Sequence, residues 1–307
     1  MRPRSSRLTS TTSASIFAYR SGQWDIQLRQ GVLHALSPVL ELRPSIHRVM
    51  FPDDPRDDEA ISHFAEVEVV PRCRDSARRL IGTISTSPQR QQILSDLADD
   101  VTSLLKQVML LCEMMQKAGP LWDWSYSDQP SISPHPQNSG LREWTVLLEL
   151  CLDAWTALRD TDALLARGLV ERWRTLPYPV FRRLCFFAMA ECDLYSPEEC
   201  LAYILEDDGW WLWSIYVYRE KFRLLDCTWP KLGNEGATEL VARIVSGPPR
   251  AMFREDLRDE DFKRIVDREV WLHLPKLQRT KRILPEPGDA RLIELSARYP
   301  KWGLGTC

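Results

Sequence analysis

The strongest constraint on the fold is a regular series of amphipathic segments in the second half of the chain. Expected helix starts fall near residues 141, 162, 177, 196, 214, 234, 258 and 287. Alternate starts, at 141, 177, 214 and 258, are 36, 37 and 44 residues apart, close to the period of about 34 to 47 residues found in two-helix repeats. Such a unit cannot bury its apolar face alone, so neighbouring units must stack on it. We therefore predict an all-α fold, with a HEAT-like helical-repeat solenoid of about four helix pairs over residues 141–307.

Local signals define several helix ends in this region. Ser196 is a candidate N-cap, followed by proline at the first helical position and by Glu199 at N3, which together make a capping box. Gly247 is placed to end a later helix. The next helix is expected to end before Pro275, because the residue before a proline avoids helical backbone angles. The whole chain has 13 glycines against 21 prolines, which also favours helices punctuated by prolines.

Residues 1–122 are predicted to form an irregular N-terminal helical region. Its clearest element is a helix over 89–118, where apolar side chains recur at steps of three and four and define one buried face. Residues 22–42 have helical spacing that breaks at Pro38. The alternating segment 64–70 is compatible with a strand or a helix edge, because period-two runs this short are ambiguous.

Three segments lack apolar periodicity and are predicted to be irregular. Residues 1–20 are basic and rich in Ser and Thr, and we expect them to be disordered. Residues 51–60 combine acids with prolines and are expected to form a loop. Residues 123–140 are rich in Ser and Pro, and we predict that they form a linker between the N-terminal region and the helical repeats.

The overall charge and the cysteines restrict the function classes. The chain of 307 residues has a formal net charge of −3, which gives no bulk attraction to nucleic acid or to an acidic membrane. No apolar run approaches the roughly 18 residues of a membrane helix. The eight cysteines have no C-x-x-C spacing, so we expect free thiols in a reducing cytoplasm and a cytoplasmic protein with no membrane partner.

Motifs for known chemistry are absent from the sequence. The phosphate loop, the dinucleotide fingerprint, H-E-x-x-H and G-x-S-x-G do not occur. The five histidines have no second His or Cys at metal-ligand spacing, and His273 is expected to be a core or groove residue. The acids near 259–261 fit the first turn of a helix, where the helix dipole favours negative charge. We predict no catalytic residue, no cofactor and no metal, and keep an enzyme with a site assembled from dispersed residues as an alternative.

The segment EDDGWWLWS, residues 206–214, contains three tryptophans that can serve as core or as a binding platform. On a helix, Trp210 and Trp213 share a face and Trp211 points about 100° away. The surrounding apolar run favours burial for most of these rings. We therefore predict that the segment forms a helix junction, with Gly209 ending the first helix and Trp211 as the ring to test for a partner.

Basic residues supply the other candidate interface positions. A nucleic-acid-binding helical repeat would need such residues on one face, and we keep it as an alternative to protein binding. The candidates are Arg182, Arg183, Arg250, Arg254, Lys276, Arg279, Lys281 and Arg282.

Residues from about 177 to 302 resemble a known family. The segments YPVFRRLCFFAMAE, LEDDGWWLWSIYVYREKFRLL, IVSGPPRAMFREDL, IVDREVWLHLPKL and LSARYPKWGL look like the C-terminal all-helical repeat region of large bacterial anti-phage defence proteins, many of which carry a sirtuin-like or P-loop effector domain. The resemblance implies a scaffold or sensor whose partner is an effector domain or a phage protein. No effector motif occurs here, so the resemblance carries over no catalytic residue and implies a fragment or shortened homologue.

Overall fold

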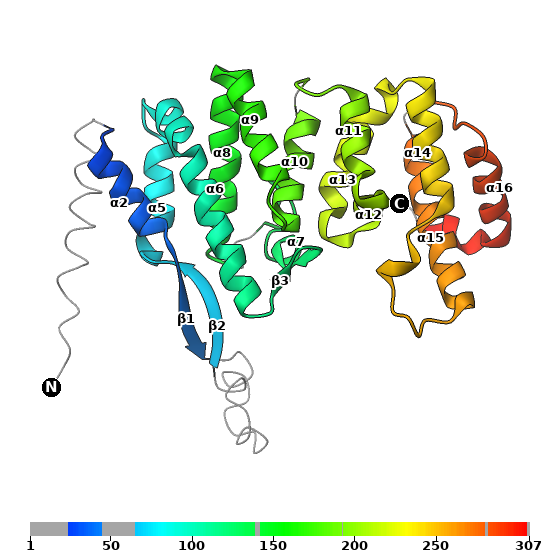
Figure 1. Ribbon diagram of the computed structural model, residues 1–307, viewed down its shortest axis with the longest axis horizontal. Coiled ribbons are helices and arrows are strands. Elements are labelled where there is room, and N and C mark those ends of the chain that lie inside the picture. The colour runs from blue at the N-terminus through cyan, green and yellow to red at the C-terminus, as the bar shows by residue number, and fades with distance from the viewer. Residues whose placement is uncertain (1–23, 45–64, 139–141, 192, 280–281, 306–307) are drawn as a thin grey trace, which may run out of the picture. The chain divides into compact units, whose positions relative to one another are not determined.

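The structure, a computed structural model, describes residues 24–44, 65–138, 142–191, 193–279 and 282–305 (Figure 1). Within these ranges the chain is mostly helical, with two antiparallel two-stranded pairs, so the prediction of an all-α class is confirmed at this level. The predicted disorder of residues 1–20 and the predicted loop at 51–60 lie outside the described residues.

The chain divides into two compact units between Phe181 and Arg182, inside helix α10. The segment that we expected to be a linker, residues 123–140, is part of the first unit as far as it is described. It is also packed, because several of its side chains are buried: Asp123, Ser125, Gln129, Ser131 and Ile132.

The first unit contains helices, a hairpin of two seven-residue strands and a shorter strand pair. Its elements are α2 (Ile26–Leu36), β1 (Pro38–Pro44), β2 (Ala65–Pro71), α5 (Arg74–Ser85), α6 (Arg90–Met114), β3 (Ala118–Gly119), β4 (Trp122–Asp123), α7 (Ser125–Asp128), α8 (Thr145–Thr161), α9 (Ala163–Arg174) and the start of α10 (Pro179–Glu191).

The long helix α6 lies at the centre of this unit and packs against α8, α9 and both strands of the hairpin. The predicted apolar face is buried along most of its length, from Leu94 to Val108. Leu111, Cys112 and Met115, at its C-terminal end, are half-buried. The apolar face of α6 is therefore buried over most of the helix and becomes partly exposed at its C-terminal end.

The ambiguous segment near residue 64 forms strand β2. The break at Pro38 separates helix α2 from strand β1, which pairs with β2. Helix α2 begins after Asp25, whose side chain accepts a hydrogen bond from the backbone N–H of Leu28. Pro38 then occupies the first position of β1, where a strand tolerates proline. Strands β1 and β2 pair antiparallel, with Glu41 opposite Glu68.

The second unit consists of helices and short 3-10 turns. Its elements are the remainder of α10, α11 (Pro197–Ile204), α12 (Glu206–Trp213), α13 (Tyr218–Thr228), α14 (Asn234–Ser246), α15 (Asp259–Gln278), α16 (Gly288–Arg298) and 3-10 turns at Ile215–Val217, Trp229–Lys231, Arg250–Met252 and Pro300–Gly305.

Two of the three predicted helix ends in this unit are confirmed, and one is wrong. Ser196 and Glu199 form the capping box, and Gly247 ends α14 with φ of +76°. Pro275, however, lies inside α15. The missing N–H removes one hydrogen bond of the helix, whereas Leu274 and Leu277 on either side of it are 0% and 3% exposed. Their burial holds the last turn in helical form.

The segment Glu206–Trp213 (α12) is interrupted by a left-handed turn. Asp207, Asp208 and Gly209 have φ of 54°, 56° and 74°, and this turn separates α11 from the tryptophans. The rings of Trp211 and Trp213 are 4% and 6% exposed. The prediction that most of these rings are core is therefore confirmed.

Candidate functional site

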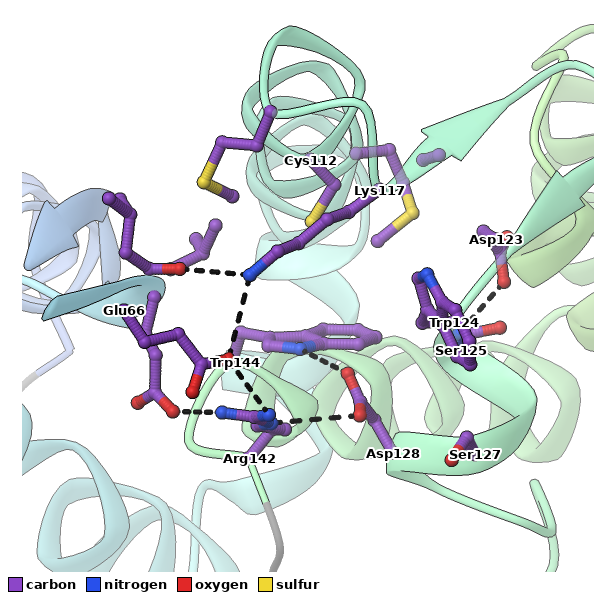
Figure 2. Close-up of a pocket in the computed structure, with 16 residues that line it drawn as sticks. Glu66, Cys112, Lys117, Asp123, Trp124, Ser125, Ser127, Asp128, Arg142 and Trp144 are labelled. Carbon is purple, nitrogen blue, oxygen red and sulfur yellow. Dashed lines mark hydrogen bonds and ion pairs between the residues drawn. The ribbon is translucent and has the colours of Figure 1, made fainter. Parts of the chain in front are cut away.

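The first unit contains a pocket of about 410 Å³ (Figure 2). This volume is within the range of about 300–1,000 Å³ that is typical of ligand pockets. Strand β2, the end of α6, the β3–α7 segment and the residues before α8 line it. The lining residues are Glu66, Val67, Glu68, Val69, Met109, Cys112, Met115, Lys117, Ala118, Asp123, Trp124, Ser125, Ser127, Asp128, Arg142 and Trp144.

The end of α6 turns sharply and brings Lys117 to the pocket. Gln116 has φ of 56°, and its N–H donates to the carbonyl of Glu113. The N–H of Lys117 donates to the carbonyl of Cys112, which completes a Schellman motif. The Lys117 ammonium then reaches the carbonyl of Val67 on β2, at 3.1 Å.

Asp123 and Trp144 fix the opposite side of the pocket. Asp123 is 1% exposed, and its carboxylate accepts from the backbone N–H groups of Ser125 and Val180. It therefore satisfies a backbone N–H group in the first turn of α7 and another in the first turn of α10. Trp144 is 5% exposed, and its indole Nε1 donates to Asp128 at 3.1 Å.

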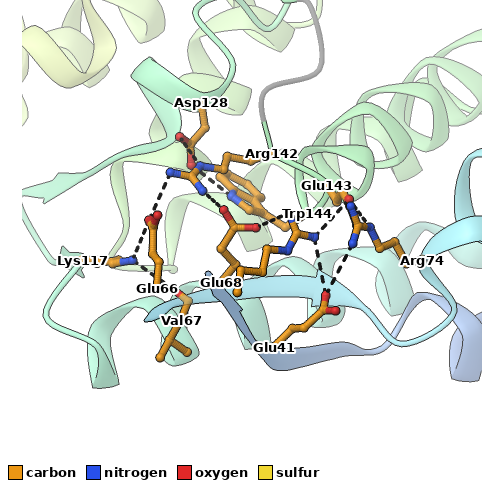
Figure 3. Close-up of polar contacts among 11 residues, drawn as sticks. Glu41, Glu66, Val67, Glu68, Arg74, Lys117, Asp128, Arg142, Glu143 and Trp144 are labelled. Atoms are coloured by element: carbon orange, nitrogen blue, oxygen red, sulfur yellow. Dashed lines mark hydrogen bonds and ion pairs between the residues drawn. The ribbon is translucent and has the colours of Figure 1, made fainter. Parts of the chain in front are cut away.

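Ion pairs connect the pocket to the hairpin (Figure 3). Arg142 pairs with Glu66, Glu68 and Asp128, and Lys117 also pairs with Glu66. The network continues outside the pocket through Arg43, Arg74, Glu41 and Glu143. Both cations that line the pocket are thus engaged by acids of the same pocket.

Burial raises the pKa values of two groups that line the pocket, the Asp128 carboxyl and the Cys112 thiol. Burial, with a smaller contribution from the nearby Asp123 and Glu66 carboxylates, raises the pKa of Asp128 to about 6 against the opposing effects of the Trp144 hydrogen bond and Lys117. Burial and the charges of Asp128 and Asp123 raise the pKa of the Cys112 thiol to about 12. The thiol is therefore protonated at neutral pH, a form that is a poor nucleophile.

The second unit has a pocket of about 450 Å³ between α10, α11 and α13. Its charged residues Asp193 and Lys231 pair with each other at the surface, with side chains 94% and 60% exposed. The pocket of the first unit instead has converging charges and two indoles, so we take it as the candidate site.

The structure places Trp211, the tryptophan singled out for a partner, in the core. The Arg182 guanidinium lies over its ring and over that of Tyr203, at 4.7 and 4.1 Å from the ring centroids. Arg182 also pairs with Glu206 at 2.8 Å. Among the three tryptophans Trp210 is the half-buried one, and Trp211, the ring that we predicted as the one to test for a partner, is only 4% exposed.

Arg183 and Arg250 also have structural partners. Arg183 is 0% exposed and forms two hydrogen bonds to the buried Glu220 carboxylate. Arg250 donates to the backbone carbonyls of Arg254, Glu255 and Leu257 and so holds the loop before α15. Arg183 is therefore a core residue, whereas Arg250 is a half-buried residue that stabilises a loop.

Within the basic cluster at 276–282, some residues have structural contacts and one is exposed. Lys276 lies over the ring of Phe222, with Nζ 3.2 Å from the centroid. Arg282 donates to the carbonyls of Trp229 and Leu232. Arg279 is exposed, as is the Arg254 side chain, which pairs with Asp256. Lys281 lies outside the described residues.

Sequence reasoning missed the residues that line the pocket. The alternation of acids and valines over 64–70 was a signal for a strand with a charged face, and Asp123, Trp124 and Asp128 lie in the segment interpreted as a linker. Cys112 and Met115 were assigned to the core, and they form a wall of the pocket instead. His273, by contrast, is 1% exposed as predicted.

Comparison of the chain with protein-family models, with curated proteins and with solved structures gives no match in any of the three. Among the described residues, no group of three or more His, Cys, Asp or Glu side chains is placed to hold a metal ion. None of the described helices combines the length and apolarity needed to cross a bilayer.

Proposed function

We propose that this chain is a non-catalytic protein-binding scaffold or sensor and that the pocket of the first unit contacts the partner. The observation that supports this proposal is that one accessible indole and one enclosed indole line the same pocket. Trp124 is 51% exposed at the pocket, and Trp144 is 5% exposed within it. Exposed tryptophans beside a formed pocket are typical of the residues that dominate binding at protein interfaces.

The charged groups and the thiol of the pocket support binding of a partner rather than catalysis. A nucleophile needs an adjacent base or a lowered pKa, and the pKa of Cys112 is raised. Lys117 and Arg142 hold the acids of the same pocket. This set of groups fits a surface that positions a partner.

The regular helices after residue 141 add a second part to the proposal. Helices α8, α9, α10, α11, α14, α15 and α16 begin within four residues of the expected starts, which supports a HEAT-like repeat for this region. With the resemblance to bacterial anti-phage defence proteins, the partner that we propose is an effector domain or a phage protein.

Site-specific photo-crosslinking of the full chain in its native cells tests the function. A benzophenone amino acid replaces Trp124 in one variant and Leu164, an 81% exposed residue of the same unit, in the control. We expect a discrete crosslinked protein from position 124 that is absent at position 164. Identical products from both positions, or none from position 124, would overturn the assignment of the pocket as the contact surface.

A further inference from the structure

The pocket has a surplus of negative charge after its own cations are counted. Four acids and two bases line it. Asp123 is occupied by backbone N–H groups, so Glu66, Glu68 and Asp128 share the two cations. Glu68 has an additional partner in Arg43, at 2.6 Å. Across the ion-pair network of the described residues, five carboxylates face four cations, so one negative charge is left without a cation. The acids are Glu41, Glu66, Glu68, Asp128 and Glu143, and the cations are Arg43, Arg74, Lys117 and Arg142.

Asp128 has the less complete set of partners. Its Oδ2 accepts from the Trp144 indole, while its Oδ1 lies 3.8 Å from Nε of Arg142, too far for a hydrogen bond. Its pKa is raised to about 6, chiefly because burial disfavours the charged form. A cation from outside would supply the charge that this carboxylate lacks.

Aromatic faces accompany these acids. Trp144 lies between the charged groups in Figure 2, and Trp124 is on the same side of the pocket as Asp128. A guanidinium can stack on an indole and donate to a carboxylate at the same time, because it is planar with hydrogen-bond donors along its edge. An ammonium group lacks this flat shape and forked geometry.

We propose that the pocket of the first unit binds an arginine side chain of a partner protein, with the guanidinium paired to Asp128 and Glu66 beside Trp144 and Trp124. The proposal rests on the protein-binding function proposed above and specifies the chemistry that the site recognises. The occupant belongs to a polypeptide because the proposed function is protein binding, and the half-exposed Trp124 gives a partner surface an indole to contact at the pocket.

Calorimetric titration of the full chain with short acetylated peptide amides tests this inference. The probes are Gly-Arg-Gly, Gly-Lys-Gly and Gly-citrulline-Gly, because citrulline keeps the shape of arginine without its charge. We expect the arginine peptide to bind at least fivefold more tightly than the lysine peptide, with no detectable binding of the citrulline peptide. Equal affinity for arginine and citrulline would overturn the proposal. Tighter binding of free arginine than of the arginine peptide would also overturn it, since a small-molecule site would then be indicated.

Matched variants locate the interaction. Asp128→Asn removes the charge and keeps an oxygen for the Trp144 indole, and we expect it to weaken arginine-peptide binding at least tenfold. Glu41→Gln removes the same charge from the ion-pair network outside the pocket, from a side chain that is 43% exposed, and should change the affinity less than twofold. Equal effects of both variants would mean that net charge alone attracts the peptide, and the site would be refuted.

Trp124→Ala gives a second readout that does not depend on charge. We expect at least fivefold weaker binding with an unchanged melting temperature, because this ring is 51% exposed. Unchanged affinity would remove Trp124 from the site and overturn the proposed geometry. If crosslinking from position 124 finds a partner but no arginine peptide binds, the proposed function stands and the arginine inference fails.

Discussion

Arg142 in the first unit and Arg183 in the second both pair with glutamate, in different surroundings. The side chains of Arg142 and Glu68 are 33% and 14% exposed, whereas those of Arg183 and Glu220 are 0% and 4% exposed. Water can replace a lost partner in the first pair, and it cannot do so in the second. An arginine–glutamate pair is thus partly solvated at the pocket of the first unit and fully buried in the core of the second.

The second unit also buries the Lys221 side chain, to which no carboxylate of the described residues forms a hydrogen bond. The Lys221 ammonium is 0% exposed and donates to the carbonyl of Leu212 at 2.8 Å. Nζ also lies 3.1 Å from Nε2 of His273 and 4.2 and 4.8 Å from the ring centroids of Phe222 and Tyr218. Nδ1 of His273 lies 2.8 Å from the carbonyl oxygen of Glu269 and donates to it, which leaves Nε2 as the acceptor. These groups stabilise the fold as long as the lysine can lose its charge.

Breaking the buried pair should give the largest effect. We expect Arg183→Met to lower the free energy of unfolding by about 3–5 kcal/mol, because it leaves the Glu220 charge buried without its partner. Urea denaturation measures this loss. The double variant Arg183→Met with Glu220→Leu should recover most of it. A loss below about 1 kcal/mol in the single variant would contradict the structural role of the pair.

Lys221 should make the stability of the protein depend on pH. Burial lowers its pKa from 10.5 to about 7, so between pH 7 and 10.5 the unfolded chain binds more protons than the folded chain. The free energy of unfolding therefore rises with pH in this window. We expect this rise to be roughly 2–4 kcal/mol smaller in Lys221→Met than in the wild type. Parallel pH profiles of the two proteins would contradict a neutral buried lysine.

Asp128 should show that the pocket is not optimised for stability. Its folded pKa of about 6 lies above the reference value of 3.8, so the folded state gains stability as pH falls through this range. Asp128→Asn is expected to raise the free energy of unfolding by about 1–2 kcal/mol at pH 7 and to lose this advantage near pH 4. Denaturation at the two pH values checks the sign. A destabilised variant at pH 7 would mean that the ion pair to Arg142 dominates.

Removing a charge from the part of the ion-pair network outside the pocket should change the free energy of unfolding least. Glu41 is 43% exposed and pairs with Arg43 and Arg74 at 3.5 and 3.9 Å. We expect Glu41→Gln to change the free energy of unfolding by less than about 0.5 kcal/mol, because exposed ion pairs are largely solvated. Thermal unfolding at low and at high salt measures this, and a loss above about 1 kcal/mol would show that the network acts as one unit.

Local signals in the sequence predicted most helix starts of the second half, because caps and apolar spacing act over a few residues. Ser196 and Gly247 are examples of such positions. Pro275 shows where this reasoning fails, since burial of its neighbours outweighs one lost hydrogen bond. Its effect depends on tertiary packing that a local rule does not include.

The pocket could not be predicted in the same way. Glu66 and Asp128 are far apart in sequence and meet because β2 pairs with β1 and the end of α6 reverses direction at Gln116. A left-handed glutamine has no strong sequence signal, since glycine is the usual residue there. The segment from Asp123 onward lacks apolar periodicity and is nevertheless packed, and the side chains of Asp123 and Asn138 hold it by hydrogen bonds to backbone groups.

The left-handed turn at Asp207, Asp208 and Gly209 has a consequence for chemical synthesis. Left-handed backbone angles are the favoured ones for residues of the mirror-image configuration. A semisynthetic chain with D-aspartate at position 207 or 208 should therefore adopt this turn with less conformational strain than the natural chain. The same replacement at Glu206, before the turn, should instead disturb the helix. The stereochemistry of single residues thus becomes a direct probe of the handedness of this junction.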